Sequence, residues 1–272
     1  MRLLVAVLML ASCTYGQTGI KIVQRIQTTG VTGMPGPAER TIITYAQGTN
    51  RRTEFPAFEP LRNVAPMKMI VIHRCDTRVL YALNPDKHEY TETQLPSPEN
   101  EAKVRQETQR KWSKGPPNLV IGTATLDTGE TKPAFGHTAR HYITTIKQIP
   151  APELGQQPSE TIQDAWYLDI PDVTTCEPVS HRPGGLIILR VGGEQAAEEV
   201  RPEFRYSGPE LHGLVLSEKT TTRSVQVFQT GEKHNTEMTT SREIVEISDE
   251  AIDPAIFEVP AGFTKVKQLT PY

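Results

Sequence analysis

The sequence is poor in aromatic residues, cysteines and net charge. Of its 272 residues only 6% are aromatic and three are cysteine, and 29 Lys and Arg residues nearly balance 32 Asp and Glu residues, which leaves a formal charge of −3. The missing basic excess argues against a nucleic-acid-binding protein, which normally carries a basic stripe. Mean hydropathy is −0.41, and after the first residues no apolar run is long enough to cross a membrane as a helix. The chain is still long enough to bury one sizeable core.

The motifs of common enzyme classes are also missing. No serine lies between two glycines in the nucleophile-elbow spacing, and no glycine-rich phosphate loop joins a strand to a helix. His137 and His141 lie four residues apart in an alternating, β-branched segment. In a strand they would be about 13 Å apart, whereas one zinc ion needs nitrogen ligands at about 2.0–2.1 Å. We therefore predict a protein that is not an enzyme, with no catalytic residues, no metal and no cofactor.

The first residues, MRLLVAVLMLASCTYGQ, have the layout of an export signal. One arginine precedes an apolar stretch of about ten residues, which is too short for a mature transmembrane helix but suits a signal peptide, predicted here over residues 1–16. Two processing sites stay open. LASC at 10–13 is typical of a bacterial lipobox, in which Cys13 carries a lipid, whereas cleavage after Gly16 leaves Gln17 first. Both predict an exported protein in the periplasm or at the outer membrane of a bacterium, with membrane association only through an anchor at Cys13.

The scarcity of cysteine narrows the expected disulfide chemistry. Cys13 belongs to the signal or its lipid anchor, so Cys75 and Cys176 remain in the mature chain. An even pair in an exported protein suggests a disulfide. Two separate buried thiols are the alternative, because spacing in sequence does not show whether the Cα atoms approach within bridging distance.

The sequence is rich in short β-favouring runs separated by turn residues. Residues 41–94 show the pattern most clearly, with turn sequences QGTN at 47–50 and NPDK at 84–87. Strands joined by links this short run antiparallel. We predict one domain over residues 17–272, mainly β, shaped as an antiparallel half-open β-barrel with a few short helices. Further strands are predicted over 19–29, 67–75, 118–127, 131–135, 137–149, 161–170, 186–191, 211–217, 221–229 and 238–248.

Two segments differ from this pattern. Residues 97–115 are a polar helical segment, with Ser97 as N-cap, Pro98 in the first turn and Gly115 after the end. Its apolar stripe is too thin for a core helix, so it is either a solvated helix that crosses an edge or the mouth of the sheet, or a gating lid. Residues 192–210 are charged and are predicted to be an irregular excursion.

Five stretches together resemble a known family: TIITYAQGTNRRTE at 41–54, IHRCDTRVLYALNPDKHEY at 72–90, GHTARHYITT at 136–145, AWYLD at 165–169 and FEVPAGF at 257–263. In this order, after an export signal, they are similar to an uncharacterised bacterial envelope family, a domain of unknown function, of the lipoprotein-carrier LolA/LolB-like superfamily. The resemblance implies a half-open antiparallel β-barrel wrapped round short helices, with an apolar concavity that holds acyl chains in the carriers. The polar helix and the 192–210 excursion depart from that pattern. The resemblance therefore implies the fold and binding of apolar ligands, but not lipoprotein carriage.

The candidate binding residues follow from the strand pattern. In a half-barrel, alternate residues of neighbouring strands converge on the concave side. The candidate ligand-binding residues, all apolar or aromatic, are Tyr45, Met69, Val71, Trp166 and Leu168. They favour a non-enzymatic protein that binds an apolar ligand, such as a lipid or a lipidated peptide. The alternative is an envelope sensor or scaffold that binds a protein partner through the same fold, for which a filled core with an exposed apolar patch would be evidence.

Two polar features near these residues are left open. Arg51 and Arg52, with Glu54, lie on one hairpin and either grip a lipid headgroup or a partner, or form an ordinary solvated face. His73 lies between Val71 and Cys75 on the apolar side of its strand, as a proton-sensitive group or as a hydrogen-bonded rim histidine.

Overall fold

The computed structural model describes residues 18–30, 38–58, 67–112, 115–176, 200–227 and 232–270. The predicted signal peptide at 1–16, the lipidation candidate Cys13 and the predicted strand at 186–191 lie outside these residues. The strands are β1 (Thr18–Thr29), β2 (Ala38–Gln47), β3 (Asn50–Phe58), β4 (Met67–Arg74), β5 (Val79–Asn84), β6 (Glu89–Gln94), β7 (Leu119–Ala134), β8 (His137–Pro150), β9 (Ser159–Leu168), β10 (Pro202–Ser207), β11 (Leu214–Val227), β12 (Lys233–Ala251) and β13 (Thr264–Lys265). The helices are α1 (Pro98–Trp112) and the 3₁₀ turns η1 (Pro152–Leu154) and η2 (Pro254–Phe257).

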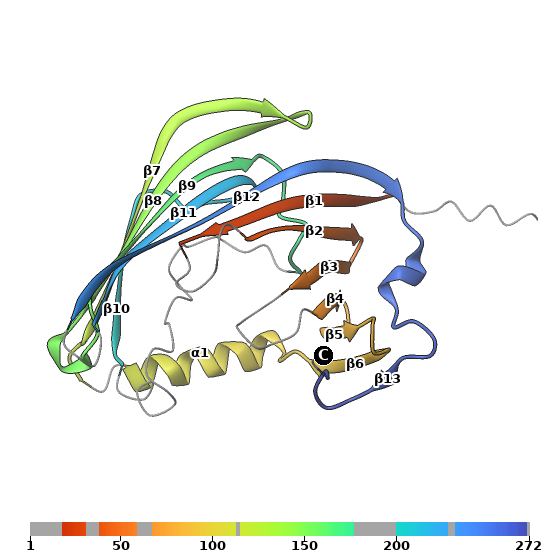
Figure 1. Ribbon diagram of the computed structural model, residues 1–272, viewed down its shortest axis with the longest axis horizontal. Coiled ribbons are helices and arrows are strands. Elements are labelled where there is room, and N and C mark those ends of the chain that lie inside the picture. Colours follow the sequence, from red (N-terminus) through yellow and green to blue (C-terminus); the bar gives the residue numbers. More distant parts are fainter. Residues whose placement is uncertain are drawn as a thin grey trace, which may run out of the picture.

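All of these strands belong to one curved sheet in the order β10-β7-β8-β9-β11-β12-β1-β2-β3-β4-β5-β6-β13. The long strands β7, β8, β9, β11 and β12 form one wall, and β1 to β6 curl away from it to form a second wall (Figure 1). Neighbours pair antiparallel except at the two edges, where β10 runs parallel to β7 and β13 runs parallel to β6. The predicted fold class, a mainly antiparallel half-open barrel with few helices, is confirmed.

Irregular register sharpens the curvature of the sheet. Extra residues interrupt the pairing of β1 with β12 at Val23/Gln24, of β7 with β8 between Asp127 and Thr131, and of β11 with β9 at Val215/Ser217. Bulges of this kind bend a strand and increase its twist. The bend lets strands of 14 to 19 residues wrap round one side of the molecule.

Two predicted strand boundaries are wrong, because the strands there are longer than the sequence suggested. Residues 118–127 and 131–135 were expected to be separate strands, as were 211–217 and 221–229, but each pair is one continuous strand, β7 or β11. The turn-like sequence after Asp127 closes on itself within the strand, where the Asp127 carboxylate accepts a hydrogen bond from the Gly129 N–H at 2.9 Å. A turn signal in sequence therefore marked a bulge and not a strand end.

A further correction concerns the segment predicted as an irregular excursion, 192–210. Its described part contains β10, which extends the sheet beyond β7 with a register from Pro202↔Leu119 to Ser207↔Ala124. Parallel pairing needs a long crossover connection, which leaves no short-range turn signal in the sequence. The strand was therefore missed.

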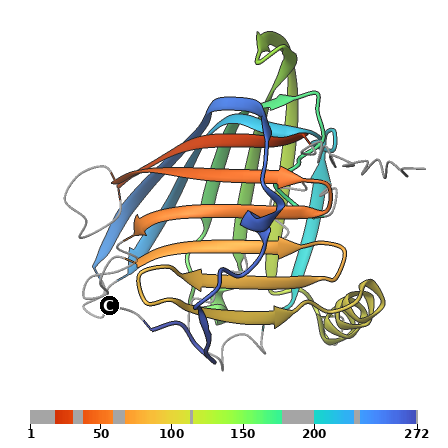
Figure 2. The ribbon, with the colours of Figure 1, turned by 90° about the vertical axis from the view of Figure 1, so that its right-hand side faces the viewer.

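The C-terminal segment, residues 252–270, covers the outer face of β2 to β6 (Figure 2). Its Phe257 is 1% exposed and packs in a cluster with Ile72, Leu83 and Ile252. Polar side chains of the strands also bind its backbone: the amide of Gln47 donates to the Ile252 carbonyl at 3.1 Å, and Asn84 donates to the Thr270 carbonyl at 2.9 Å. This face of the sheet is therefore a closed, packed layer.

Helix α1 crosses the open side of the half-barrel from one sheet edge to the other (Figure 1). Its first turn is tied beside β5 by the ion pair of Arg78 with Glu101 at 2.5 Å. Its last residue, Trp112, contacts Phe204 of β10 with ring centroids 5.9 Å apart. Between these ends Val104 is 60% exposed, so the helix is a solvated strap across the mouth and contributes little to the core.

Candidate ligand-binding surface

The two faces of β3, β4 and β5 differ in how their apolar residues are covered. Side chains alternate along a strand, so Ile70 and Ile72 of β4 face outward into the cluster under the C-terminal segment. Met69 and Val71 alternate with them along β4 and face the concave side. We call the two sides the outer face and the inner face of the sheet.

The inner face of these strands carries an apolar strip. The cross-strand register places Phe55 opposite Met69, and Val71 opposite Ala82. The strip consists of five half-buried apolar side chains: Phe55, Met69, Val71, Leu80 and Ala82. None of them belongs to the hydrophobic clusters formed by the described residues. A half-buried apolar surface on a concave face is the kind of surface that an apolar ligand can cover.

The strip ends at a cationic side chain. Arg51 lies on the inner face of β3, opposite His73 and four residues before Phe55, so about 13 Å of strand separates it from the far end of the strip. One guanidinium nitrogen, Nη1, donates to the carbonyls of Gly48 at 2.6 Å and Asn50 at 2.8 Å. Burial lowers the pKa of Arg51 from its ordinary value, and the negative charge of Asp172 opposes that shift.

The neighbouring arginine has a different environment. Arg52 points to the outer face, where its Nε contacts the Glu54 carboxylate at 2.8 Å and its Nη1 donates to the Ile256 carbonyl at 2.8 Å. Arg51 has no carboxylate of the described residues within the 4.0 Å limit of an ion pair, and its Nε is buried without a hydrogen-bond partner. Sequence analysis considered these two arginines together, but they lie on opposite faces of β3, and of the two only Arg52 forms an ion pair with a described residue.

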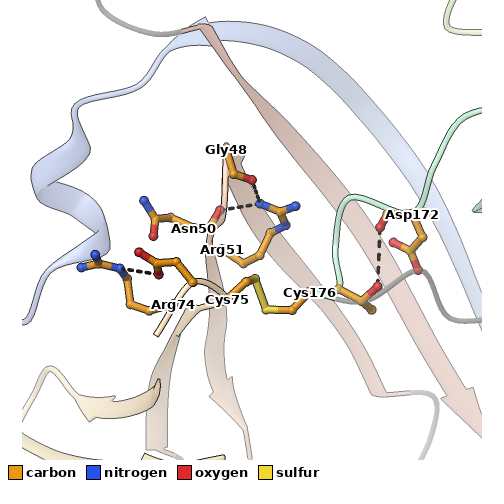
Figure 3. The surroundings of a disulfide bond; sticks show 9 residues. Gly48, Asn50, Arg51, Arg74, Cys75, Asp172 and Cys176 are labelled. Carbon is orange, nitrogen blue, oxygen red and sulfur yellow. Dashed lines mark hydrogen bonds and ion pairs between the residues drawn. A yellow bond between two sulfur atoms is a disulfide. The ribbon is translucent and has the colours of Figure 1, made fainter. Parts of the chain in front are cut away.

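A disulfide closes the chain over this end of the inner face. Cys75 at the end of β4 is joined to Cys176, with a Cα–Cα distance of 5.3 Å, so the pair considered from sequence is bonded in the structure. Figure 3 shows Arg51 between the turn at Gly48 and the segment that carries Asp172 and Cys176. The Asp172 carboxylate accepts hydrogen bonds from the backbone and the hydroxyl of Thr174. The disulfide therefore fixes the segment after β9 next to the Arg51 guanidinium.

The structure separates the five residues that the sequence grouped as a ligand site. Met69 and Val71 lie together on the inner strip. Tyr45 faces the other way, because it is opposite Arg52, and packs on the cluster around Ile72. The five residues therefore do not all converge on one concave surface.

The last two of the grouped residues lie on β9. Leu168 is fully buried in a cluster with Ala139 and Leu214, so it is part of the packed core. Trp166, two residues earlier on the same side of β9, also packs against this cluster, and its partner Ser217 is in line with Glu243 of β12 and Arg25 of β1. There it lines a groove of about 340 Å³ whose other walls are mostly charged, among them Arg25, Asp164, Lys219 and Glu243.

Beside this groove, His141 forms a polar network with Trp166. The rings stack with centroids 4.7 Å apart, and His141 Nε2 lies 2.9 Å from the Asp164 carboxylate. Its Nδ1 lies 3.1 Å from the hydroxyl of Thr128, which also lies within hydrogen-bonding distance of the His141 carbonyl and accepts from the Glu130 N–H. The contacts of Thr128 join the β7 bulge to β8, so the arrangement accounts for the buried histidine as a structural group. No group of three or more described His, Cys, Asp or Glu side chains could hold a metal ion.

Sequence analysis missed three members of this surface. Phe55 precedes a proline at the end of its run, and Leu80 and Ala82 lie in a run whose outer face is equally apolar. Alternation alone shows that both faces of such a run are apolar, but not which one is packed. The signal that could have helped is the length and hydrophobicity of the C-terminal segment, whose Phe257 and Phe263 need a sheet face to cover.

Comparisons with known proteins give a distant structural similarity only. No protein-family profile matches the sequence, and no curated protein is similar to it. A LolA superfamily protein from Nitrosomonas europaea is 7% identical, over 90% of this chain and 91% of that one, with a TM-score of 0.28. A DUF1329 family protein from Desulfovibrio piger is 10% identical, over 90% and 91% of the two chains, also with a TM-score of 0.28.

None of the described helices is long and apolar enough to cross a membrane.

Proposed function

We propose that this chain is a non-enzymatic binder of an apolar ligand, a lipid or a lipidated peptide, in the bacterial envelope. The observation that carries the proposal is the contrast between the two faces of β3 to β5. The outer face is closed by the C-terminal segment, with Ile72 and Leu83 0% exposed. The inner face has an apolar strip that is only half-buried, on the concave side of a sheet whose mouth is crossed by a solvated helix.

Methionine suits this role. Its unbranched, polarisable side chain adapts to irregular apolar shapes, and Met69 lies in the middle of the strip beside Phe55 and Val71. An acyl chain laid along β3 and β4 would cover these side chains without disturbing the packed outer layer. The free energy for binding would come from removing the strip and the acyl chain from water, at about 25 cal/mol per Å² of apolar area.

The test is uptake of a fluorescent fatty acid. The wild-type protein is expected to bind the probe, and Met69→Arg is expected to weaken binding at least about tenfold, because a charge in the strip must be desolvated when the ligand covers it. Met238→Arg is the matched control: Met238 is 42% exposed on β12, and the same change there should leave uptake unaltered. If the wild type takes up no probe, or if both variants behave alike, the proposal fails and a protein partner becomes the better reading of the fold.

Location in the envelope has a separate test at Cys13. If residues 10–13 are a lipobox, intact mass of the protein from a bacterial envelope will show a diacylglycerol modification on Cys13. Cys13→Ala should then release the protein from membranes, because the variant cannot carry the acyl chains that anchor the lipidated form. An unmodified mature chain that begins at Gln17 would instead show a form without an anchor.

A further inference from the structure

Arg51 is a charged group that has no ion pair with a carboxylate of the described residues. Two other partly buried arginines have carboxylate partners: Arg74 pairs with Glu258 at 2.8 Å, and Arg242 pairs with Glu218 at 3.1 Å. Their Nε atoms are also buried without a hydrogen bond, although that of Arg74 lies 3.5 Å from the Asp76 carboxylate, so a buried Nε alone does not set Arg51 apart. Arg51 differs because, among the described residues, its guanidinium contacts two backbone carbonyls and no carboxylate, and Asp172 acts on it only through space.

The position of this charge defines what could approach it. Arg51 shares the inner face of β3 with Thr53 and Phe55, and so stands at one end of the apolar strip. The hydrogen bond from its Nη1 to Gly48 lies in an exposed environment, whereas Nε is buried. The guanidinium therefore has one side fixed by the hairpin turn and an outer end that meets solvent. A guanidinium cannot be deprotonated in a protein under ordinary conditions, so the charge persists despite burial.

We infer that Arg51 is the headgroup site of the inner strip, and that the ligand is an anionic amphiphile whose acid group pairs with this guanidinium while its acyl chain lies along β3 and β4. The inference rests on the proposed function. Carboxylate and phosphate oxygens match the forked donors of arginine. An acid group at this position would supply the charge that the described residues do not, and the acyl chain would run over Val71 and Met69 toward Phe55.

Asp172 sets the strength of this site. Its charge acts on Arg51 through space, but it lies beyond ion-pair distance and its carboxylate is hydrogen-bonded by Thr174. Asp172 would repel an acid group that approaches Arg51. The disulfide at Cys176 holds this carboxylate-bearing segment in place, so the charge of Asp172 opposes the ligand's acid group in a fixed position.

The experiment compares two probes of equal chain length, one charged and one neutral: a dansyl-labelled undecanoic acid and its methyl ester, titrated by fluorescence. Wild-type protein is expected to bind the acid more tightly than the ester. Arg51→Gln should weaken binding of the acid by about 10- to 100-fold, the range for a lost hydrogen-bonded charge, and should leave ester binding within about twofold. Because each variant is its own control through the ester, partial loss of folding cannot mimic the result.

Three further variants sharpen the test. Arg52→Gln on the outer face makes the same change one residue away and should not alter the acid-to-ester ratio. Arg51→Lys retains charge and should recover part of the preference for the acid. Asp172→Asn should tighten acid binding several-fold and leave ester binding unaltered. Replacing the acid by an alkyl phosphate of equal chain length, or by inorganic phosphate alone, separates a carboxylate headgroup, a phosphate headgroup and a free anion.

The outcomes separate the inference from the proposed function. If neither the acid nor the ester binds to wild-type protein, the proposed function itself is wrong. If both bind equally and Arg51→Gln changes neither, the strip binds apolar chains but Arg51 is only a hairpin brace, and the headgroup inference is overturned. Binding of inorganic phosphate with the same dependence on Arg51 and no gain from an acyl chain would also overturn it.

Discussion

Replacement of Cys75 and Cys176 by serine is expected to lower the free energy of unfolding by up to about 4–5 kcal/mol, because the bond closes a loop with a sequence separation of 101 residues. In the chain-entropy account, this cross-link restricts the unfolded chain more than the folded one. The loop joins the end of β4 to the segment after β9, which are on different walls of the half-barrel. Urea denaturation followed by circular dichroism would measure the change as a lower midpoint at similar slope.

Reduction provides the control for the cysteine variant. Wild-type protein in reductant should unfold at the midpoint of the double-serine variant, and reductant should have no effect on that variant. The single variants Cys75→Ser and Cys176→Ser should each show most of the loss, because either one removes the bond. Equal midpoints for oxidised wild type and the double variant would mean that the bond contributes nothing to stability in solution.

The sequence was sufficient to predict the kind of fold, because the evidence for it is local. Turn residues at 47–50 and 84–87 join paired strands in the structure, β2 with β3 and β5 with β6. Asn84 accepts hydrogen bonds from the N–H groups of Asp86 and Lys87, as a turn-initiating asparagine does. Alternation along β4 correctly placed Met69 and Val71 on one face and Ile70 and Ile72 on the other.

The candidate site was less predictable, because it depends on the exact register between paired strands. Tyr45 and Met69 are on strands separated by β3 alone, yet they face opposite sides, since Tyr45 is opposite Arg52 and Met69 is opposite Phe55. A shift of one residue in either pairing would have reversed this result. Register of this kind is set by the packing of whole faces, which no single run of residues reports.

The same limit explains the arginine pair. Arg51 and Arg52 are adjacent and chemically equal, so the sequence gives no reason to treat them differently. Only their opposite orientation in β3 puts Arg52 beside Glu54 and under the C-terminal segment, and Arg51 on the concave side. The backbone carbonyl of Ile256 that binds Arg52 is 204 residues away in the chain, a contact that local pattern analysis cannot anticipate.

Two leucines of β5 provide the most direct test of the difference between the faces. Leu83 points outward and is 0% exposed in the cluster with Phe257. Leu80, three residues earlier, points inward and is half-buried on the apolar strip. The substitution Leu→Ala is therefore chemically identical at two positions on one strand, and only the environment differs.

Leu83→Ala is expected to reduce the free energy of unfolding by about 3–5 kcal/mol, because it removes buried methyl groups and leaves a cavity under the C-terminal segment that the sheet cannot close. Leu80→Ala should cost only about 1 kcal/mol, a fraction of the about 1.5–3 kcal/mol that full burial of a leucine contributes. Binding should show the reverse order. At temperatures where both variants are folded, Leu80→Ala should weaken uptake of the fluorescent fatty acid, and Leu83→Ala should bind it as the wild type does.

The combination of both readouts makes the comparison decisive for the lipid-binding proposal. If the two variants lose equal stability, the inner strip is packed as firmly as the outer layer and offers no surface to a ligand. If Leu80→Ala is nearly neutral in stability and also unaltered in uptake, the probe binds elsewhere on the protein. A stability loss confined to Leu83→Ala together with an affinity loss confined to Leu80→Ala is expected only when one face of β5 forms the core and the other face receives the ligand.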